Sequence, residues 1–150
     1  MLTKLLAVTY EPASLALVCI HTDKIRRDQV YNICLAQQRI GRLEIGWVYS
    51  ALKLDLINIQ PDFRNKGIGT ALLKYLLELA AANGRSSLII NTTQSLALLH
   101  IAEKLRPNCL CTVKTFYGNK PIRWQKDRLN AKHVYHVNLP VVSKAERTEH

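Results

Sequence analysis

An anion-binding turn is expected at residues 64–69, whose sequence is Arg-Asn-Lys-Gly-Ile-Gly. The segment follows Pro61, where a strand should end because proline cannot donate to a sheet ladder, and it runs into an Ala-Leu-Leu stretch typical of a helix. The first N–H groups of a helix lack partners within it, and its dipole makes that end positive. Glycines let the backbone approach a phosphate closely, and Arg64 and Lys66 add positive charge.

Two common phosphate loops do not fit this segment. The Walker pattern, Gly-x-x-x-x-Gly-Lys followed by Ser or Thr, is absent from the sequence. The dinucleotide fingerprint Gly-x-Gly-x-x-Gly is incomplete, since Leu72 stands where the third glycine after Gly67 and Gly69 would fall. On spacing alone, a glycine pair also fits a simple tight turn.

The longer string around the glycines is more specific. Arg64, Gly67 and Gly69 follow a strand ending in x-Pro-x-Phe, precede a helix, and match the pattern Arg or Gln, two residues, Gly, one residue, Gly or Ala. In these positions the segment resembles the acyl-CoA motif of the GNAT N-acetyltransferase superfamily, and the likeness extends over about Leu52 to Leu105. The resemblance implies that family's α/β fold: a mixed, mostly antiparallel sheet with a central splayed parallel strand pair and flanking helices. It also implies acetyl-CoA as co-substrate and acyl transfer to a primary amine.

The resemblance further implies where acetyl-CoA would lie. Pantetheine would pair with exposed backbone groups of the splayed strand, at Ile57, Asn58 and Ile59. The diphosphate would sit on the backbone amides of Arg64, Asn65, Lys66, Gly67, Ile68, Gly69 and Thr70. The thioester would lie in the V-shaped opening beside the strand Ser87–Asn91, and no metal is expected in the site.

Transfer to an amine needs a base that accepts a proton and donors that stabilise the oxyanion. Asp55 is the candidate base, because strand alternation would put it on one face with Lys53, Ile57 and Ile59, and because members of the family often carry Glu or His on this strand at this position or two earlier. The alternative is that Asp55 only pairs with Lys53 or a neighbouring strand. The oxyanion donor would be a backbone N–H at Ile59 or Asn58.

The acid that protonates the leaving thiolate is harder to assign. Many members of the family carry a tyrosine in the second helix, in a pattern like Leu-Tyr-Glu-Lys-Leu-Gly-Phe, and here Ala102 stands at that position. His100 lies two residues away and so points about 200° from it. Tyr117, in a predicted loop, is the candidate acid, although a thiolate can also leave unaided.

Apolar runs and breakers predict the elements that position these residues. The predicted strands are Leu5–Tyr10, Leu15–His21, Val30–Gln37, Ile40–Tyr49, Leu52–Gln60, Ser87–Asn91, Cys109–Thr115 and Lys132–Leu139. The predicted helices are Gly67–Asn83 and a second one, capped by Thr92, Thr93 or Ser95, that runs to about Leu105. Phe116–Asn130 is expected to be a loop. One N-acetyltransferase domain should span residues 1–142, followed by a charged, disordered tail at 143–150.

Composition limits the classes of protein that fit. The 150 residues carry 21 Lys and Arg against 11 Asp and Glu, giving a net charge of +10. This charge attracts anions, including a phosphorylated cofactor or nucleic acid, but identifies neither. The four cysteines match no zinc spacing and fit buried thiols in a reducing compartment. No stretch suits a signal peptide or a membrane span, so a cytoplasmic location without membrane contact is expected.

Other functions fit the same residues. The basic loop Lys114–Lys132, with Tyr117 and Trp124, also suits a nucleic-acid-binding module. The missing tyrosine suits a catalytically inactive CoA-binding regulator. Residues 22–29 are too short for the two helices that often line the acceptor pocket in this family, so the site would be open to a macromolecular acceptor or to a partner chain. Exposed sheet edges near the C-terminus would also allow a homodimer.

Overall fold

A computed structural model describes residues 5–8, 10, 14–93 and 95–142. Within these residues, one mixed sheet contains the strands β1 (Leu5–Val8), β2 (Leu15–Asp23), β3 (Asp28–Leu35), β4 (Gln38–Trp47), β5 (Ala51–Ile59), β6 (Ser87–Thr93), β7 (Leu110–Thr115), β8 (Gly118–Pro121) and β9 (Tyr135–Pro140). The helices are α1 (Ile68–Ala82), α2 (Leu96–Leu105) and the 3₁₀ turn η1 (Pro61–Phe63). The predicted tail at 143–150 and the predicted break at residues 11–12 lie outside the described part.

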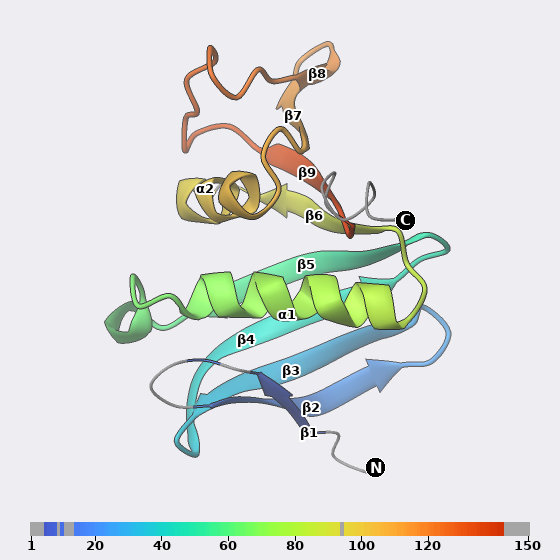
Figure 1. The fold of residues 1–150 in the computed structure, drawn as a ribbon, viewed down its shortest axis with the longest axis vertical. Coiled ribbons are helices and arrows are strands. Elements are labelled where there is room, and N and C mark those ends of the chain that lie inside the picture. The colour runs from blue at the N-terminus through green and yellow to red at the C-terminus, as the bar shows by residue number, and fades with distance from the viewer. Residues whose placement is uncertain (1–4, 9, 11–13, 94, 143–150) are drawn as a thin grey trace.

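The sheet order is β1-β2-β3-β4-β5-β6-β9-β7-β8. Every described neighbour pair is antiparallel except β5 and β6, which run parallel because α1 connects them. The predicted mixed, mostly antiparallel sheet with a central parallel pair is therefore confirmed. Figure 1 shows α1 lying across the half formed by β1–β5, and α2 beside the half that contains β6 and β9.

Local sequence explains the two helices. In α1, the buried side chains recur at helical spacing and face the sheet; they are Ile68, Leu72, Leu73, Leu76, Leu77 and Ala80. In α2, Ser95 is the N-cap, and its side-chain oxygen accepts a hydrogen bond of 3.2 Å from the backbone N–H of Leu98. Arg106 ends α2 and fixes it to the sheet, since its guanidinium donates to the carbonyls of Pro140 and Val141.

Two predicted boundaries were wrong in a way that affects function. Residues 116–130 were predicted to be a loop, but Gly118–Pro121 forms β8, which pairs with β7 in a tight hairpin. The last strand begins at Tyr135, not at Lys132. The connection between β3 and β4 lies two residues earlier than expected, because Ala36 and Gln37 both adopt positive φ angles and form the two-residue turn.

The core lies between the sheet and the two helices. Cys109, which directly precedes β7, and Cys111 on β7 both contribute to it. Of the four cysteines predicted to be buried, Cys19, Cys109 and Cys111 are buried and Cys34 is partly exposed. Burial raises the pKa of the Cys109 thiol to about 12 and that of Cys111 to about 11. Tyr31 is also fully enclosed, and burial raises its pKa to about 12. Among the described residues, neither helix has the length and apolar character needed to cross a bilayer.

Candidate functional site

The strands β5 and β6 separate halfway along their length. Their parallel pairing runs from Ala51 and Ser87 to Leu54 and Ile90 and then stops. In the ladder between β4 and β5, the consecutive β4 residues Glu44 and Ile45 pair with Leu56 and Leu54 of β5. Asp55, between Leu54 and Leu56, is therefore an extra residue that bulges out of the ladder. On the other side, the pairing of β6 with β9 shifts register beyond Ile90. These irregularities open a V between the strands, which diverge in Figure 1. Asp55 follows the last residue of the β5–β6 ladder, Leu54, and so lies near the closed end of the V.

The backbone of β5 beyond the bulge presents hydrogen-bonding groups to this V. The N–H of Gln60 donates to the carbonyl of Ile40 on β4, at 2.8 Å. Because successive residues of a strand turn their N–H and C=O groups to opposite sides, Asn58 faces β4, whereas Ile57 and Ile59 face the V. Of the three strand residues predicted to bind pantetheine, two therefore have the required backbone direction.

The turn between β5 and α1 is held in shape from two sides. Asn65 and Gly67 both have positive φ angles, of 61° and 83°. The Nε of Arg64 donates to the carbonyl of Ile59 at 2.7 Å, which ties the turn to the end of β5. The hydroxyl of Tyr10 donates to the carbonyl of Lys66 at 2.6 Å, across 56 residues of chain. Sequence analysis did not identify Tyr10, since such a long-range contact leaves no local pattern.

The first turn of α1 offers unpaired donors. The helical ladder begins with the N–H of Ala71, which donates to the carbonyl of Gly67 at 3.1 Å. Within the part of the chain that the structure describes, no side chain caps this end. The preceding N–H groups of Ile68, Gly69 and Thr70 thus have no acceptor within the helix, as expected of a first turn. Gly69 also lets α1 approach α2, because a Cβ there would lie only 3.2 Å from Cδ1 of Ile101.

A cavity of about 640 Å³ joins the strand, the turn and the two helices. It is lined by Ile57, Asn58, Ile59, Phe63, Arg64, Asn65, Gly67, Ile68, Gly69, Thr70, Ser95, Ala97, Leu98 and Ile101. The structure thus gathers nine of the ten residues predicted for the cofactor. The exception is Lys66, whose side chain lies over the ring of Phe63, with its Nζ 6.0 Å from the ring centroid. The lining from α2 was not predicted individually, although the helix itself was.

A smaller cavity of about 260 Å³ adjoins the larger one at Ile57, Ser95 and Leu98 and lies in the V. It is lined by Leu54, Asp55, Leu56, Ile57, Ile90, Asn91, Thr93, Ser95 and Leu98. Oδ1 of Asp55 accepts a hydrogen bond of 3.1 Å from Nδ2 of Asn91 and lies 3.8 Å from Nζ of Lys53. The carboxylate is therefore placed where the two strands part, and it is partnered as well as accessible to the cavity.

The prediction that Asp55 shares one strand face with Lys53, Ile57 and Ile59 was wrong in part. Lys53 pairs with Gly46, and Ile57 pairs with the buried Leu43. Four steps along β5 thus correspond to three steps along β4. The bulge thus leaves Asp55 on the face of Lys53 and turns Ile57 to the opposite face. Period-two counting could not detect this, because an inserted residue resets the alternation.

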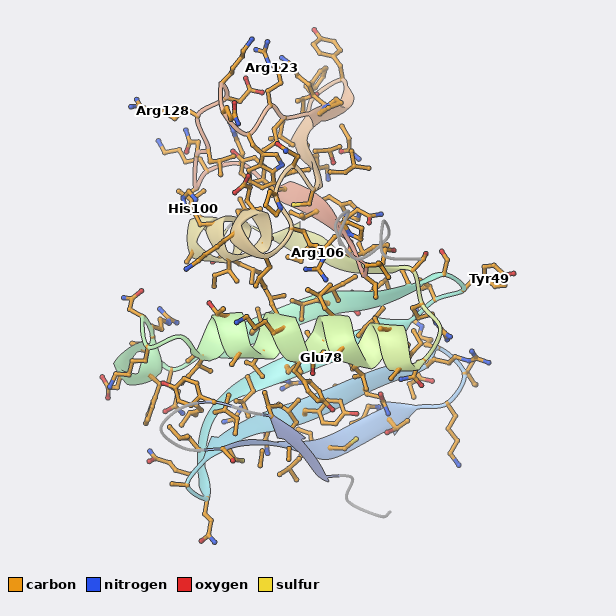
Figure 2. The ribbon with its side chains drawn as sticks, in the orientation of Figure 1. Tyr49, Glu78, His100, Arg106, Arg123 and Arg128 are labelled. Atoms are coloured by element: carbon orange, nitrogen blue, oxygen red, sulfur yellow. The ribbon has the colours of Figure 1, made fainter. Side chains whose placement is uncertain are left out.

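The structure does not bring Tyr117 to the cavity. Tyr117 lies at the tip of the β7–β8 hairpin and is 95% exposed. The prediction of a catalytic Tyr117 depended on a loop that could fold back, and the tight turn between Thr115 and Gly118 prevents this. Ala102, at the usual tyrosine position, is fully buried, and His100 is exposed on the outer side of α2 (Figure 2). Instead, Ser95 borders both cavities, a role that the sequence indicated only as a helix cap.

Among the described residues, no group of three or more His, Cys, Asp or Glu side chains could hold a metal ion. Around the smaller cavity, the described side chains offer the carboxylate of Asp55 and the hydroxyl and amide groups of Ser95, Thr93 and Asn91. The larger cavity adds the guanidinium of Arg64 and the backbone donors of the first turn of α1.

Comparisons with known proteins agree with this geometry. The model of the acetyltransferase (GNAT) family matches residues 9–106. No curated protein sequence matches the chain. Among solved structures, a GNAT acetyltransferase from Elizabethkingia anophelis with acetyl-CoA bound has a TM-score of 0.53 at 20% identity, with 75% of this chain and 76% of that chain covered.

Two Bacillus enzymes are similar to the same extent. An IAA acetyltransferase from Bacillus cereus has a TM-score of 0.55 at 18% identity, covering 76% of this chain and 78% of its own. An acetyltransferase from Bacillus subtilis in complex with CoA has a TM-score of 0.55 at 16% identity, covering 76% and 77%. At these identities the likeness establishes the fold.

Proposed function

We propose, from the premise that this chain belongs to the acetyltransferase (GNAT) family, that it transfers an acetyl group from acetyl-CoA to a primary amine. The observation that carries the proposal is that the two cavities adjoin, with Ile57, Ser95 and Leu98 in the lining of both. The unpaired N–H groups of the first turn of α1 open into the same space as the backbone of β5, and that space leads to Asp55. A long ligand with a diphosphate at one end and a reactive group at the other fits this arrangement.

In this proposal, the diphosphate lies on the N–H groups of Ile68, Gly69 and Thr70, where the helix dipole also favours negative charge. The side chains of Arg64 and Lys66 contribute positive charge nearby. Pantetheine runs along β5 and pairs with the V-facing backbone of Ile57 and Ile59, as an added strand would. The thioester then lies in the smaller cavity, beside Asp55.

Asp55 acts as the base, directly or through one water. It accepts a proton from the attacking amine, whose nitrogen forms the new bond to the thioester carbonyl carbon. The N–H of Ile57 stabilises the oxyanion, because it faces the V and Ile57 borders the smaller cavity, whereas Ile59 borders the larger one and Asn58 faces β4. The C–S bond then breaks, and CoA leaves as a thiolate that takes up a proton.

Ser95 takes part in the last step of this scheme. Its oxygen accepts from the N–H of Leu98, so its own O–H proton is directed elsewhere and is available to the thiolate sulfur. A thiol needs less assistance in leaving than an alkoxide does, so a hydrogen bond suffices in place of a strong acid. This is consistent with Ala102 standing at the usual tyrosine position.

The proposal is tested in two steps. Acetyl-CoA, and not adenosine, should raise the melting temperature of the protein, because adenosine lacks the diphosphate and pantetheine. Release of free CoA from acetyl-CoA is then followed with a thiol reagent in the presence of primary amines: amino acids, polyamines, and peptides with free N-termini or lysines. Turnover with at least one amine, lost on heating the enzyme, supports the proposal. Stabilisation without turnover over the whole panel contradicts it.

That second outcome is the one expected of an inactive CoA-binding regulator, which Ala102 and the exposed Tyr117 favour. The partly buried Asp55 at the closed end of the V argues for the enzyme, since a pure binding protein has no need of a carboxylate beside the thioester. The acceptor's size, a homodimer and a cytoplasmic location stay predictions. The free thiols in the described part fit a reducing compartment.

A further inference from the structure

The β7–β8 hairpin and the loop that follows it form a projecting basic arm, defined here as residues 114–133 (Figure 1). This arm takes no part in the proposed acetyl transfer. It carries six cationic side chains and one acidic one, so 6 − 1 gives +5, which is half of the net charge of the chain. The cationic residues are Lys114, Lys120, Arg123, Lys126, Arg128 and Lys132, and all of them are exposed. Figure 2 shows Arg123 and Arg128 at the outer side of the arm.

Little on the protein neutralises these charges. Within the described residues, Arg123 is the one cation of the arm that forms an ion pair, with Asp127 at 3.3 Å. Hydrogen bonds from the backbone and guanidinium of Arg123 lower the pKa of Asp127, which stays ionised and holds the loop in a turn. The remaining five cations form no ion pair with a described residue, although Lys120 is close enough to Asp127 to help lower the pKa of that carboxyl. With five such cations, the surface suits a ligand with several negative charges.

Two aromatic rings are exposed at the tip of the hairpin. The side chains of Phe116 and Tyr117 are each 95% exposed, which is rare for such large apolar groups. Their ring centroids are 5.3 Å apart and their planes stand at 85°, so the two rings present faces in different directions. Two cations flank them, because Lys114 and Lys120 lie on the facing strands just below the turn. Aromatic faces between basic groups can stack on unpaired bases while the cations bind phosphates.

The arm is anchored in this shape. The indole N–H of Trp124 donates to the carbonyl of Cys109, and its ring packs against the core. The N–H of Asn130 donates to the hydroxyl of the buried Tyr135, at 2.9 Å. Trp124 is thus part of the anchor and not one of the stacking groups. These bonds fix the loop after β8, while the β7–β8 ladder holds the tip of the hairpin. No described element covers Phe116 or Tyr117 there.

We propose that the basic arm binds single-stranded RNA, with phosphates on its lysines and arginines and bases on Phe116 and Tyr117. A single strand fits better than a duplex, because duplex bases are stacked within the helix and leave nothing for the two rings to contact. It also fits better than an anionic membrane, because the cations spread over the hairpin and the loop, whereas the only large apolar side chains at the tip are these two. The proposal is independent of acetyl transfer.

The test uses the full chain and a fluorescently labelled oligouridine of 20 nucleotides. Binding to five phosphates gives a slope of log K against log salt of about −3.5, so affinity should fall about a hundredfold between 50 and 200 mM salt. Phe116→Ala combined with Tyr117→Ala should weaken binding tenfold or more, because each stacked base is lost. Lys114→Gln combined with Lys126→Gln should reduce the slope by about 1.4.

A matched control removes the same charge elsewhere. Lys24→Gln combined with Lys74→Gln changes two exposed lysines on the β2–β3 turn and on α1 and leaves the arm intact. This variant should bind RNA within about twofold of the wild type. Equal losses in the control and arm variants would overturn the proposal, as would an RNA duplex bound as tightly as the single strand. Binding to phosphatidylserine vesicles in the absence of RNA binding would overturn it in favour of a membrane surface. Circular dichroism checks that each variant is folded.

Discussion

The side-chain amide of Asn91 on β6 donates a hydrogen bond of 3.1 Å to the carboxylate of Asp55 on β5, at the point where these strands separate. This bond joins the two sides of the V where the backbone ladder no longer does. It also orients the carboxylate next to the smaller cavity. The relationship makes Asp55 the first residue to test.

Asp55→Asn keeps the size of the side chain and removes its ability to accept a proton. If Asp55 is the base, kcat should fall about 10²- to 10⁴-fold, while KM for acetyl-CoA should change little, because the cofactor contacts lie elsewhere. Steady-state kinetics with saturating amine measure both constants. Glu44→Gln is the matched control, since Glu44 lies on the adjacent strand and is paired with Arg42, at 3.0 Å. A loss of similar size in the control, or full activity in Asp55→Asn, would exclude Asp55 as the base.

Gly67→Ala tests the turn that leads into α1. Gly67 has a φ of 83°, and an alanine in that region costs about 1 kcal/mol. Relaxation of this strain would rotate the first N–H groups of α1, so the Kd for CoA should rise roughly tenfold. Gly84→Ala is a matched control at the other end of the helix, with a φ of 71° and no atom within 4 Å of the added Cβ. Both variants should lose similar stability in urea, and only Gly67→Ala should lose affinity by calorimetry. Equal affinities would show that the turn does not hold the ligand.

Tyr10→Phe tests the long-range support of the same turn. The substitution removes the hydroxyl that donates to the carbonyl of Lys66 and keeps the ring beside Gly67. Loss of one hydrogen bond of about 0.5–1.5 kcal/mol should raise the Kd for CoA about 2- to 10-fold. Tyr49→Phe serves as control, since Tyr49 is fully exposed at the β4–β5 turn (Figure 2). A Kd unchanged in Tyr10→Phe would mean that the turn keeps its shape without this bond.

The buried thiols predict how stability depends on alkaline pH. A free thiol in the unfolded chain loses its proton near pH 9.0, whereas burial keeps Cys109 and Cys111 protonated to about pH 12 and 11. Above pH 9 the unfolded chain therefore binds fewer protons than the folded one. The free energy of unfolding should fall as pH rises, by up to about 1.4 kcal/mol per pH unit for each thiol.

Urea unfolding between pH 7 and 10.5 measures this dependence. The double variant Cys109→Ala, Cys111→Ala should show a shallower decline above pH 9, even though its stability at pH 7 is lower because two core side chains are truncated. At pH 7 the thiols are protonated in both states, so the slope there should be the same in variant and wild type. An identical slope above pH 9 would contradict the link to these two cysteines.

Local sequence predicted the site better than it predicted the catalytic geometry. The turn at residues 64–69 and α1 could be found because each leaves a short-range signal: glycines at fixed spacing and apolar residues at helical period. The parallel strand pair was expected from the resemblance to the family that these residues carry. The residues gathered around the larger cavity follow from that order of elements.

The bulge at Asp55 and the hairpin at Tyr117 could not be found in this way. A bulge depends on the register between two strands, and no pattern within β5 alone distinguishes it from regular alternation. The strand β8 is four residues long, contains Lys120 and Pro121, and is exposed throughout, so it lacks the apolar alternation that marks a strand. Its pairing with β7 depends on the tight turn between Thr115 and Gly118. This turn places Tyr117 at the tip of the hairpin, away from the V.

The short parallel ladder between β5 and β6 also has a mechanical consequence. Within the described chain, this ladder joins the half of the sheet with β1–β5 to the half with β6–β9 through four residue pairs. At one end of the ladder, the N–H of Ser86 also donates a hydrogen bond to the carbonyl of Ser50. A cofactor held by α1 and α2 together bridges both halves at the opposite end from that attachment. Occupancy should therefore limit their rocking, and amide hydrogen exchange at residues 55–59 and 95–101 should slow together when CoA is added.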